Sequence, residues 1–103
     1  MEKKHMFELL AEETPGLQKV FLDLISTIKS DAGLDEKTFQ LVYIGISAHR
    51  GETGSVIAHV GPAKRAGATR DEVRGAVLVS LMTCGVAGIR DCLQAALDTY
   101  DNV

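Results

Sequence analysis

The segment ETGSVIAHVGPAKRAGATRDEV, which runs from Glu52 to Val73, decides the fold of this chain. Its first half predicts a helix that carries His59, and Gly67 is placed to end this helix as a left-handed cap. In its second half, Thr69 and Glu72 have the spacing of a capping box, in which the two side chains satisfy exposed backbone amides. The segment therefore predicts two consecutive helices joined by a short turn.

Apolar residues recur every three or four positions over the rest of the chain, which is the period of an amphipathic helix. Asp35 is placed to cap one of these helices, and Gly61-Pro62 predicts a kink in another. The expected helices cover about 4–12, 17 to a stop at 31–33, 35–49, 55–66, 69–83 and 86–100. We therefore expect an all-α fold of about six helices. It would form one domain over 1–103, with N-terminal helices in 1–33 and a core in 34–100.

Length and composition restrict the functions that this chain can have. Its 103 residues are enough for one small domain. A formal net charge of −3 and the lack of any basic run argue against nucleic acid as a partner. The longest uncharged run, Gly75–Ile89, has 15 residues and is too short to span a bilayer, which takes roughly 20. Without a secretory signal at the N-terminus, we expect a cytoplasmic protein without a membrane partner.

Two expected helices, 35–49 and 69–83, are apolar on too many sides for surface helices of a small monomer. One of them can be central, but a chain of this length can hardly surround both. The remaining apolar surface is expected to meet another subunit. The sequence therefore predicts a homo-oligomer.

Glu52, Ser55 and His59 follow one another at spacings of three and four, so a helix would place them on one face. An imidazole takes up and releases protons near neutral pH, which makes His59 a candidate for acid–base chemistry. The alternative is structural. His59 would then be a hydrogen-bonded histidine of the fold, and the other two side chains would cap exposed helix amides.

Two other chemistries are open to this chain. His49, Glu52 and His59 lie across a glycine break and lack a closed ligand set at a recognisable spacing, so we expect no metal site. Cys84 and Cys92 have the character of small buried apolar residues. In a redox alternative, Cys84 would react with peroxide while His59 acts as the base, which requires a stabilised thiolate.

An apolar helix that ends in Ser47-Ala-His-Arg-Gly51 comes before the helix with His59, and AKRAGAT at 63–69 and DEV at 71–73 follow. This order resembles the carboxymuconolactone decarboxylase family, which includes the alkylhydroperoxidase D-like proteins. The resemblance covers roughly 34–100. It implies an all-α, alkylhydroperoxidase D-like subunit that assembles into a trimer or hexamer with sites near subunit interfaces.

The chain departs from the redox branch of this family. There, two cysteines spaced C-x-x-C precede the histidine, and a glutamate lies upstream. The matching positions here are Glu52 and Ser55 for the cysteines, His59 for the histidine and Gln40 for the glutamate. A peroxidase cycle needs one thiolate to attack the peroxide and a second thiol to resolve the sulfenic acid. The dithiol mechanism is therefore not expected.

The decarboxylase branch, as the resemblance implies, acts without a metal or organic cofactor on a small carboxylated lactone. In this interpretation His59 carries the proton, Glu52 orients the imidazole or acts as a second acid–base group, and Ser55 donates to a substrate oxygen. Gln40 would contact a substrate carbonyl or amide, and Arg50 would hold a carboxylate in a bidentate pair.

The predicted function is thus cofactor-independent acid–base chemistry, a decarboxylation or isomerisation, on a small organic acid or lactone. In enzyme terms this is lyase-like activity. Two alternatives stay open: an alkylhydroperoxidase-like antioxidant that uses Cys84 only, and an oligomer that binds a ligand or partner without catalysis.

Overall fold

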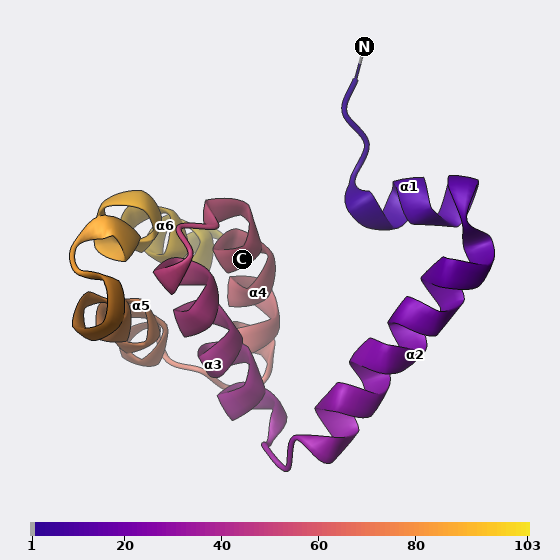
Figure 1. Cartoon of the computed structure of the whole chain (residues 1–103). Coiled ribbons are helices and arrows are strands. Elements are labelled where there is room, and N and C mark those ends of the chain that lie inside the picture. The colour runs from indigo at the N-terminus through magenta and orange to yellow at the C-terminus, as the bar shows by residue number, and fades with distance from the viewer. Residues whose placement is uncertain (1) are drawn as a thin grey trace. The chain divides into compact units, whose positions relative to one another are not determined.

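A computed structural model describes residues 2–103, and within this range it contains helices and no strands (Figure 1). The helices are α1 (Met6–Glu13), α2 (Pro15–Asp31), α3 (Glu36–His49), α4 (Thr53–Arg65), α5 (Arg70–Cys84), the π-helical segment η1 (Ile89–Leu93) and α6 (Gln94–Asn102). The prediction of an all-α chain of about six helices is confirmed. The chain divides into two compact units, one up to Gly33 and one from Leu34. No helix within residues 2–103 combines the length and the apolar character needed to cross a membrane.

The N-terminal unit consists of α1 and α2. Helix α1 begins at Met6, two residues later than the predicted start, because the His5 ring caps it by accepting from the amide of Phe7 at 3.1 Å. The Phe7 and Phe21 rings lie 5.8 Å apart, and Gln18 donates to the Phe7 carbonyl at 3.2 Å. No residue of either helix is buried, so the unit has only this partial packing between its own helices.

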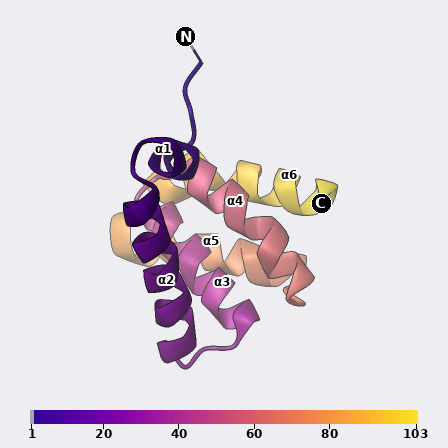
Figure 2. The same cartoon turned by 90° about the vertical axis from the view of Figure 1, so that its right-hand side faces the viewer.

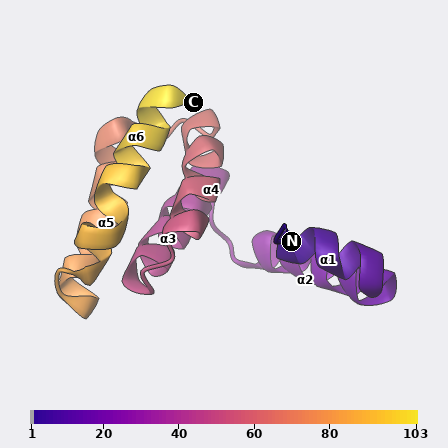
Figure 3. The same ribbon diagram turned by 90° about the horizontal axis from the view of Figure 1, so that it is seen from above.

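In the second unit, α3 packs against both α4 and α5, and α6 packs against α4 and α5. Figure 2 shows α3 beside α4. Figure 3 shows the pair of α3 and α4 next to a second pair, α5 and α6. The four helices form a small bundle. Its first pair, α3 and α4, carries most of the polar residues that the sequence singles out.

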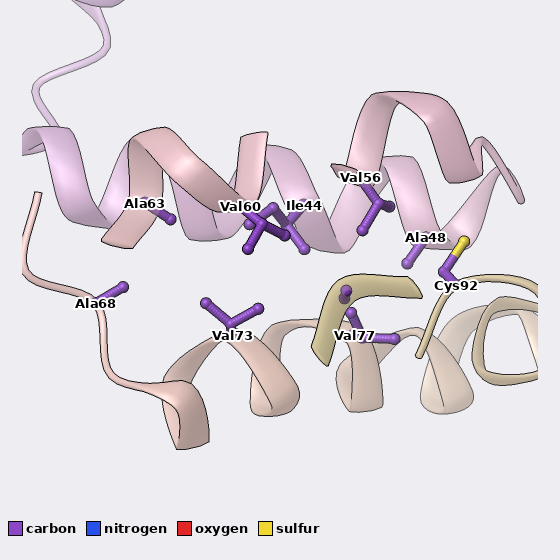
Figure 4. Close-up of a cluster of buried hydrophobic side chains, with 10 residues drawn as sticks. Ile44, Ala48, Val56, Val60, Ala63, Ala68, Val73, Val77 and Cys92 are labelled. Carbon is purple, nitrogen blue, oxygen red and sulfur yellow. The ribbon is translucent and has the colours of Figure 1, made fainter. Parts of the chain in front are cut away.

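The core of this bundle is built from small side chains, which let the helices approach closely (Figure 4). Every helix of the second unit contributes, and so does the turn before α5. The buried apolar residues are Ile44, Ala48, Val56, Val60, Ala63, Ala68, Val73, Val77, Cys92 and Ala96. Because these side chains interlock α3 with α4, they fix the register in which polar residues of the two helices meet.

The helix ends agree closely with the local sequence signals. Asp35 caps α3 by accepting from the Thr38 amide at 2.7 Å. Both bonds of the predicted capping box between Thr69 and Glu72 are present at the start of α5. Gly67 has φ +99°, the left-handed conformation expected for a glycine just after a helix.

The region after α5 differs from the prediction of one helix over 86–100. Gly85, with φ +73°, ends α5, and the chain then forms the π-helical segment η1 before α6 begins. The Thr53 hydroxyl donates to the Asp91 carbonyl at 2.9 Å and so satisfies a backbone acceptor within this wider turn. This contact joins residues far apart in the sequence, which is why helical periodicity alone did not indicate it.

Candidate functional site

One face of α3 carries a polar stripe formed by Glu36, Gln40, Tyr43 and Ser47. These positions are separated by four, three and four residues, so they lie one above another on the helix. The stripe begins in the first turn of α3, just after the Asp35 cap. It meets two residues of α4, Ser55 and His59, through direct contacts between side chains.

His59 lies against the middle of this stripe. Its Nδ1 is 2.8 Å from Oε1 of Gln40, and its ring stacks on Tyr43 with ring centroids 3.6 Å apart and planes inclined by 22°. The imidazole is half-buried, whereas the Tyr43 ring is 38% exposed. Contacts on the ring face and at Nδ1 therefore hold His59 in a defined orientation at the surface of the bundle.

Gln40 makes two contacts within the protein that the sequence did not indicate. It is only 4% exposed, its Nε2 donates to Oε1 of Glu36 at 2.9 Å, and its Oε1 faces His59. Both ends of the amide therefore have protein partners, which leaves it poorly placed to contact a substrate carbonyl. In the structure, Gln40 connects Glu36 to His59.

Ser55 lies one helical turn from His59, on the same side of α4. Its Oγ is 3.1 Å from Oγ of Ser47, so the two hydroxyls share a hydrogen bond between α4 and α3. This bond accounts for the buried polar position of Ser47. The polar contact between α3 and α4 thus extends from His59 and Gln40 to Ser55 and Ser47, toward the turn that joins the two helices.

Glu52 and Arg50 form a separate pair near the turn between α3 and α4, with Arg50 Nη2 3.2 Å from Glu52 Oε1. Glu52 precedes His59 by seven residues, which is about 10 Å along a helix axis. It makes no side-chain capping bond at the start of α4, so the capping alternative does not hold for this residue. The structure therefore brings Gln40 to His59 and leaves Glu52 with Arg50 two turns away.

A groove of about 600 Å³ lies on another side of α3, between α3 and α5. It is lined by Leu41, Val42, Gly45, Ile46, His49, Glu72, Ala76, Val79 and Thr83. Apart from His49, Thr83 and Glu72, its lining is apolar. His59 is not part of this lining, so the groove and the polar stripe are distinct features of α3.

Two polar contacts mark the ends of the groove. Nδ1 of His49 lies 2.8 Å from the Thr83 hydroxyl, which itself donates to the Ser80 carbonyl at 3.1 Å. At the other end, the Thr69 backbone amide and the Lys37 ammonium lower the pKa of Glu72 below its usual range. The groove is therefore apolar along its length, with a carboxylate at one end.

The two cysteines have free thiols and different surroundings. Cys92 is fully buried in the core, as expected for a small apolar residue, and its sulfur lies 3.8 Å from the Thr53 hydroxyl. Cys84 is half-buried at the end of α5, where its thiol contacts the Gly85 carbonyl at 3.8 Å. None of these contacts is with a charged group that would stabilise a thiolate.

The metal interpretation of His49, Glu52 and His59 finds no common centre. Each of the three has a different partner, namely Thr83, Arg50 and Gln40. Within the part of the chain that the structure describes, no three histidine, cysteine or acidic side chains come together as metal ligands.

Sequence reasoning missed Glu36, Tyr43 and Ser47 as neighbours of the predicted site. The signal was present, because all three lie at helical spacing from Gln40 on the same face of α3. It was hidden by the apolar residues between them, which made this helix look apolar nearly all round.

The bundle is all-α, and His59 of α4 lies in it against α3. The model of the carboxymuconolactone decarboxylase family matches residues 15–98. The chain belongs to this family. No curated protein is significantly similar to it.

Proposed function

We propose that this chain catalyses cofactor-independent acid–base chemistry, a decarboxylation or isomerisation, on a small organic acid or lactone, with His59 as the proton carrier. The observation that supports this most is the contact of 2.8 Å between His59 Nδ1 and the buried Gln40 amide. A proton carrier must be held in one orientation and still be reachable by substrate. His59 meets both conditions, since it is bonded at Nδ1, stacked on Tyr43 and half-buried.

In a decarboxylation, the bond between the carboxylate carbon and its neighbour breaks and carbon dioxide leaves. The electron pair that stays behind is delocalised onto an adjacent carbonyl, and the carbon then takes a proton from the imidazolium of His59. In an isomerisation, the neutral imidazole removes a proton from a carbon next to a carbonyl and returns it at another carbon. Either reaction needs one group that gives and takes a proton near neutral pH.

The geometry narrows the set of residues that take part. We propose that the hydroxyl of Ser55, one turn from His59, donates to a substrate oxygen. This bond would replace the one between Ser55 and Ser47. Arg50 and Glu52 neutralise each other two helical turns away, and a small substrate at His59 would not reach them. We therefore propose no substrate contact for this pair.

We also propose that the working form is a homo-oligomer. The α3 and α5 surfaces around the groove expose several large apolar side chains, and monomeric proteins seldom leave extensive apolar patches uncovered. The family resemblance implies sites near subunit interfaces, and the family model matches this chain over residues 15–98. In the single chain the Tyr43 side of the site is open to solvent, so a neighbouring copy would help to exclude water there.

The test is turnover of a panel of small carboxylated lactones and their open-chain acids, followed by carbon dioxide release and by proton exchange at carbon. We expect His59→Gln to reduce kcat/KM by at least about 100-fold, the usual contribution of a general acid–base group. The control is His5→Gln, which removes a histidine of the N-terminal unit that caps α1. Undiminished turnover in His59→Gln would refute the role of His59. A wild-type chain inactive on the whole panel would refute the substrate class.

A further inference from the structure

We propose that Glu36 is a positioning residue that sets the tautomer of His59 through the side-chain amide of Gln40. Two contacts carry this inference: Gln40 Nε2 donates to Glu36 Oε1 at 2.9 Å, and Gln40 Oε1 lies 2.8 Å from His59 Nδ1. The sequence offers Gln40 and His59 as separate candidates. The structure links both of them to Glu36, a residue that the sequence analysis does not single out.

The chemistry of the three groups allows one arrangement. An ionised carboxylate only accepts hydrogen bonds, so Glu36 requires the NH₂ group of Gln40 to face it. The amide oxygen must then face His59, and because that oxygen can only accept, Nδ1 must carry a proton. If the Gln40 amide were reversed, its oxygen would face the Glu36 carboxylate, and neither group could donate a hydrogen bond to the other. Since Gln40 is 4% exposed, water cannot readily take over from either partner.

This arrangement assigns different tasks to the two ring nitrogens. In the neutral imidazole, Nδ1 holds its proton against Gln40, and Nε2 has the lone pair. A glutamine at this position cannot take up the Nδ1 proton as a carboxylate could. The proton transferred during catalysis therefore enters and leaves at Nε2. This last step rests on the proposed function, whereas the tautomer itself does not.

The experiment is a long-range ¹H–¹⁵N correlation spectrum of the full ¹⁵N-labelled chain, recorded where the imidazoles are neutral. The chain has three histidines, and His59→Phe identifies the signals of His59 by their loss. We expect the wild type to be predominantly in the Nδ1–H form. In Glu36→Ala the ratio of Nδ1–H to Nε2–H should fall by roughly tenfold, the equilibrium effect of one hydrogen bond to a charged group.

Two controls isolate the effect of Glu36. His49 is an internal reference, because its Nδ1 faces a Thr83 hydroxyl that already donates elsewhere, and its tautomer should be the same in every sample. Asp71→Ala removes one acidic residue from the first turn of α5 and should leave His59 unchanged. A general loss of folding would alter both histidines.

The proposal is overturned by a wild-type His59 that is mainly in the Nε2–H form, or by a Glu36→Ala ratio equal to that of the wild type. If Glu36→Ala does not fold, Glu36→Gln replaces it. The new amide can accept or donate, so the ratio should still fall, and an unchanged ratio again overturns the proposal. A wild-type Nδ1–H form that depends on Glu36, in a chain without lactone turnover, would leave the positioning role standing and refute the proposed function alone.

Discussion

Gly88 lies where the chain after α5 comes closest to its neighbours. A Cβ at this position would be 2.7 Å from the Ala48 carbonyl oxygen and closer still to the Ser80 hydroxyl. Both groups are buried and cannot move away without disturbing the core. We expect Gly88→Ala to lower the free energy of unfolding by about 1–3 kcal/mol, the usual cost of overpacking. Urea unfolding followed by circular dichroism measures this change.

Gly75→Ala is the matched control for this substitution. Gly75 lies inside α5, and a Cβ there would have no heavy atom within 4 Å apart from its own helix. Alanine is a better helix former than glycine, so we expect Gly75→Ala to raise the free energy of unfolding by about 0.5–1 kcal/mol. Opposite signs for the two variants would show that the close approach at Gly88 matters. Equal effects would contradict it.

At the candidate site, the sequence singles out polar residues but does not show which of them are in contact. His59 was predictable because an isolated histidine on a helix of small residues stands out, and Gln40 because it is polar in an apolar helix. The grouping of Glu52 with His59 assumed that helical spacing alone makes a site. It could not show that Glu52 pairs with Arg50 in the turn. Nor could it show that Gln40 faces His59, which follows from how α3 packs on α4.

Asp35 caps helix α3, and the ionised state of its carboxyl group leads us to expect a pH dependence of stability. The Thr38 backbone amide, then the Thr38 side chain and Lys37, lower the pKa of Asp35 below its ordinary value. A carboxyl whose pKa is lower in the folded state stabilises the fold above its unfolded pKa, and this stability is lost as the pH falls through the folded value. The pKa values of Glu72 and Asp101 are shifted in the same direction. We therefore expect the free energy of unfolding to fall below about pH 4.

Asp35→Asn tests the part of this pH dependence that comes from the cap. Asparagine caps helices about as well as aspartate but does not titrate, so α3 should form while its acid sensitivity decreases. The expected result is a shallower fall of unfolding free energy between about pH 5 and pH 2 than in the wild type. Asp23→Asn, at an exposed α2 residue that caps no helix, is the control for charge. Parallel curves for Asp35→Asn and the wild type would contradict the prediction.

Elements were predictable where a local signal sets them. The Asp35 cap, the Thr69 capping box and the left-handed Gly67 each act within a few residues, and the structure shows all three. The π-helical turn η1 was not predictable in this way. It is accompanied by a bond from Thr53 to Asp91 and by the close approach of Gly88 to Ala48, and both link positions more than 30 residues apart.

At the scale of the whole molecule, the chain leaves much apolar surface uncovered. In the lining of the groove between α3 and α5, Ile46 is 59% exposed, Val79 62% and Val42 45%. The groove lining contains only one carboxylate, Glu72. Surfaces that are apolar and poor in charge at their centre are typical of the buried core of subunit interfaces. The occupant that we propose for this surface is a second copy of the chain.

This proposal predicts assembly in solution. In analytical ultracentrifugation the wild type should sediment as an oligomer. Ile46→Glu or Val79→Glu should shift the equilibrium toward the monomer, because assembly would then bury a carboxylate that has no partner. We expect the dissociation constant to rise by at least about 30-fold, as for the loss of a central interface residue. Gln94→Glu, an exposed position of α6 outside the groove, is the control and should assemble as the wild type does.

A wild type that stays monomeric at every concentration would refute the assembly. The groove would then be an apolar surface that the native protein leaves open to solvent. An oligomer that tolerates both substitutions would place the interface on another face of the chain.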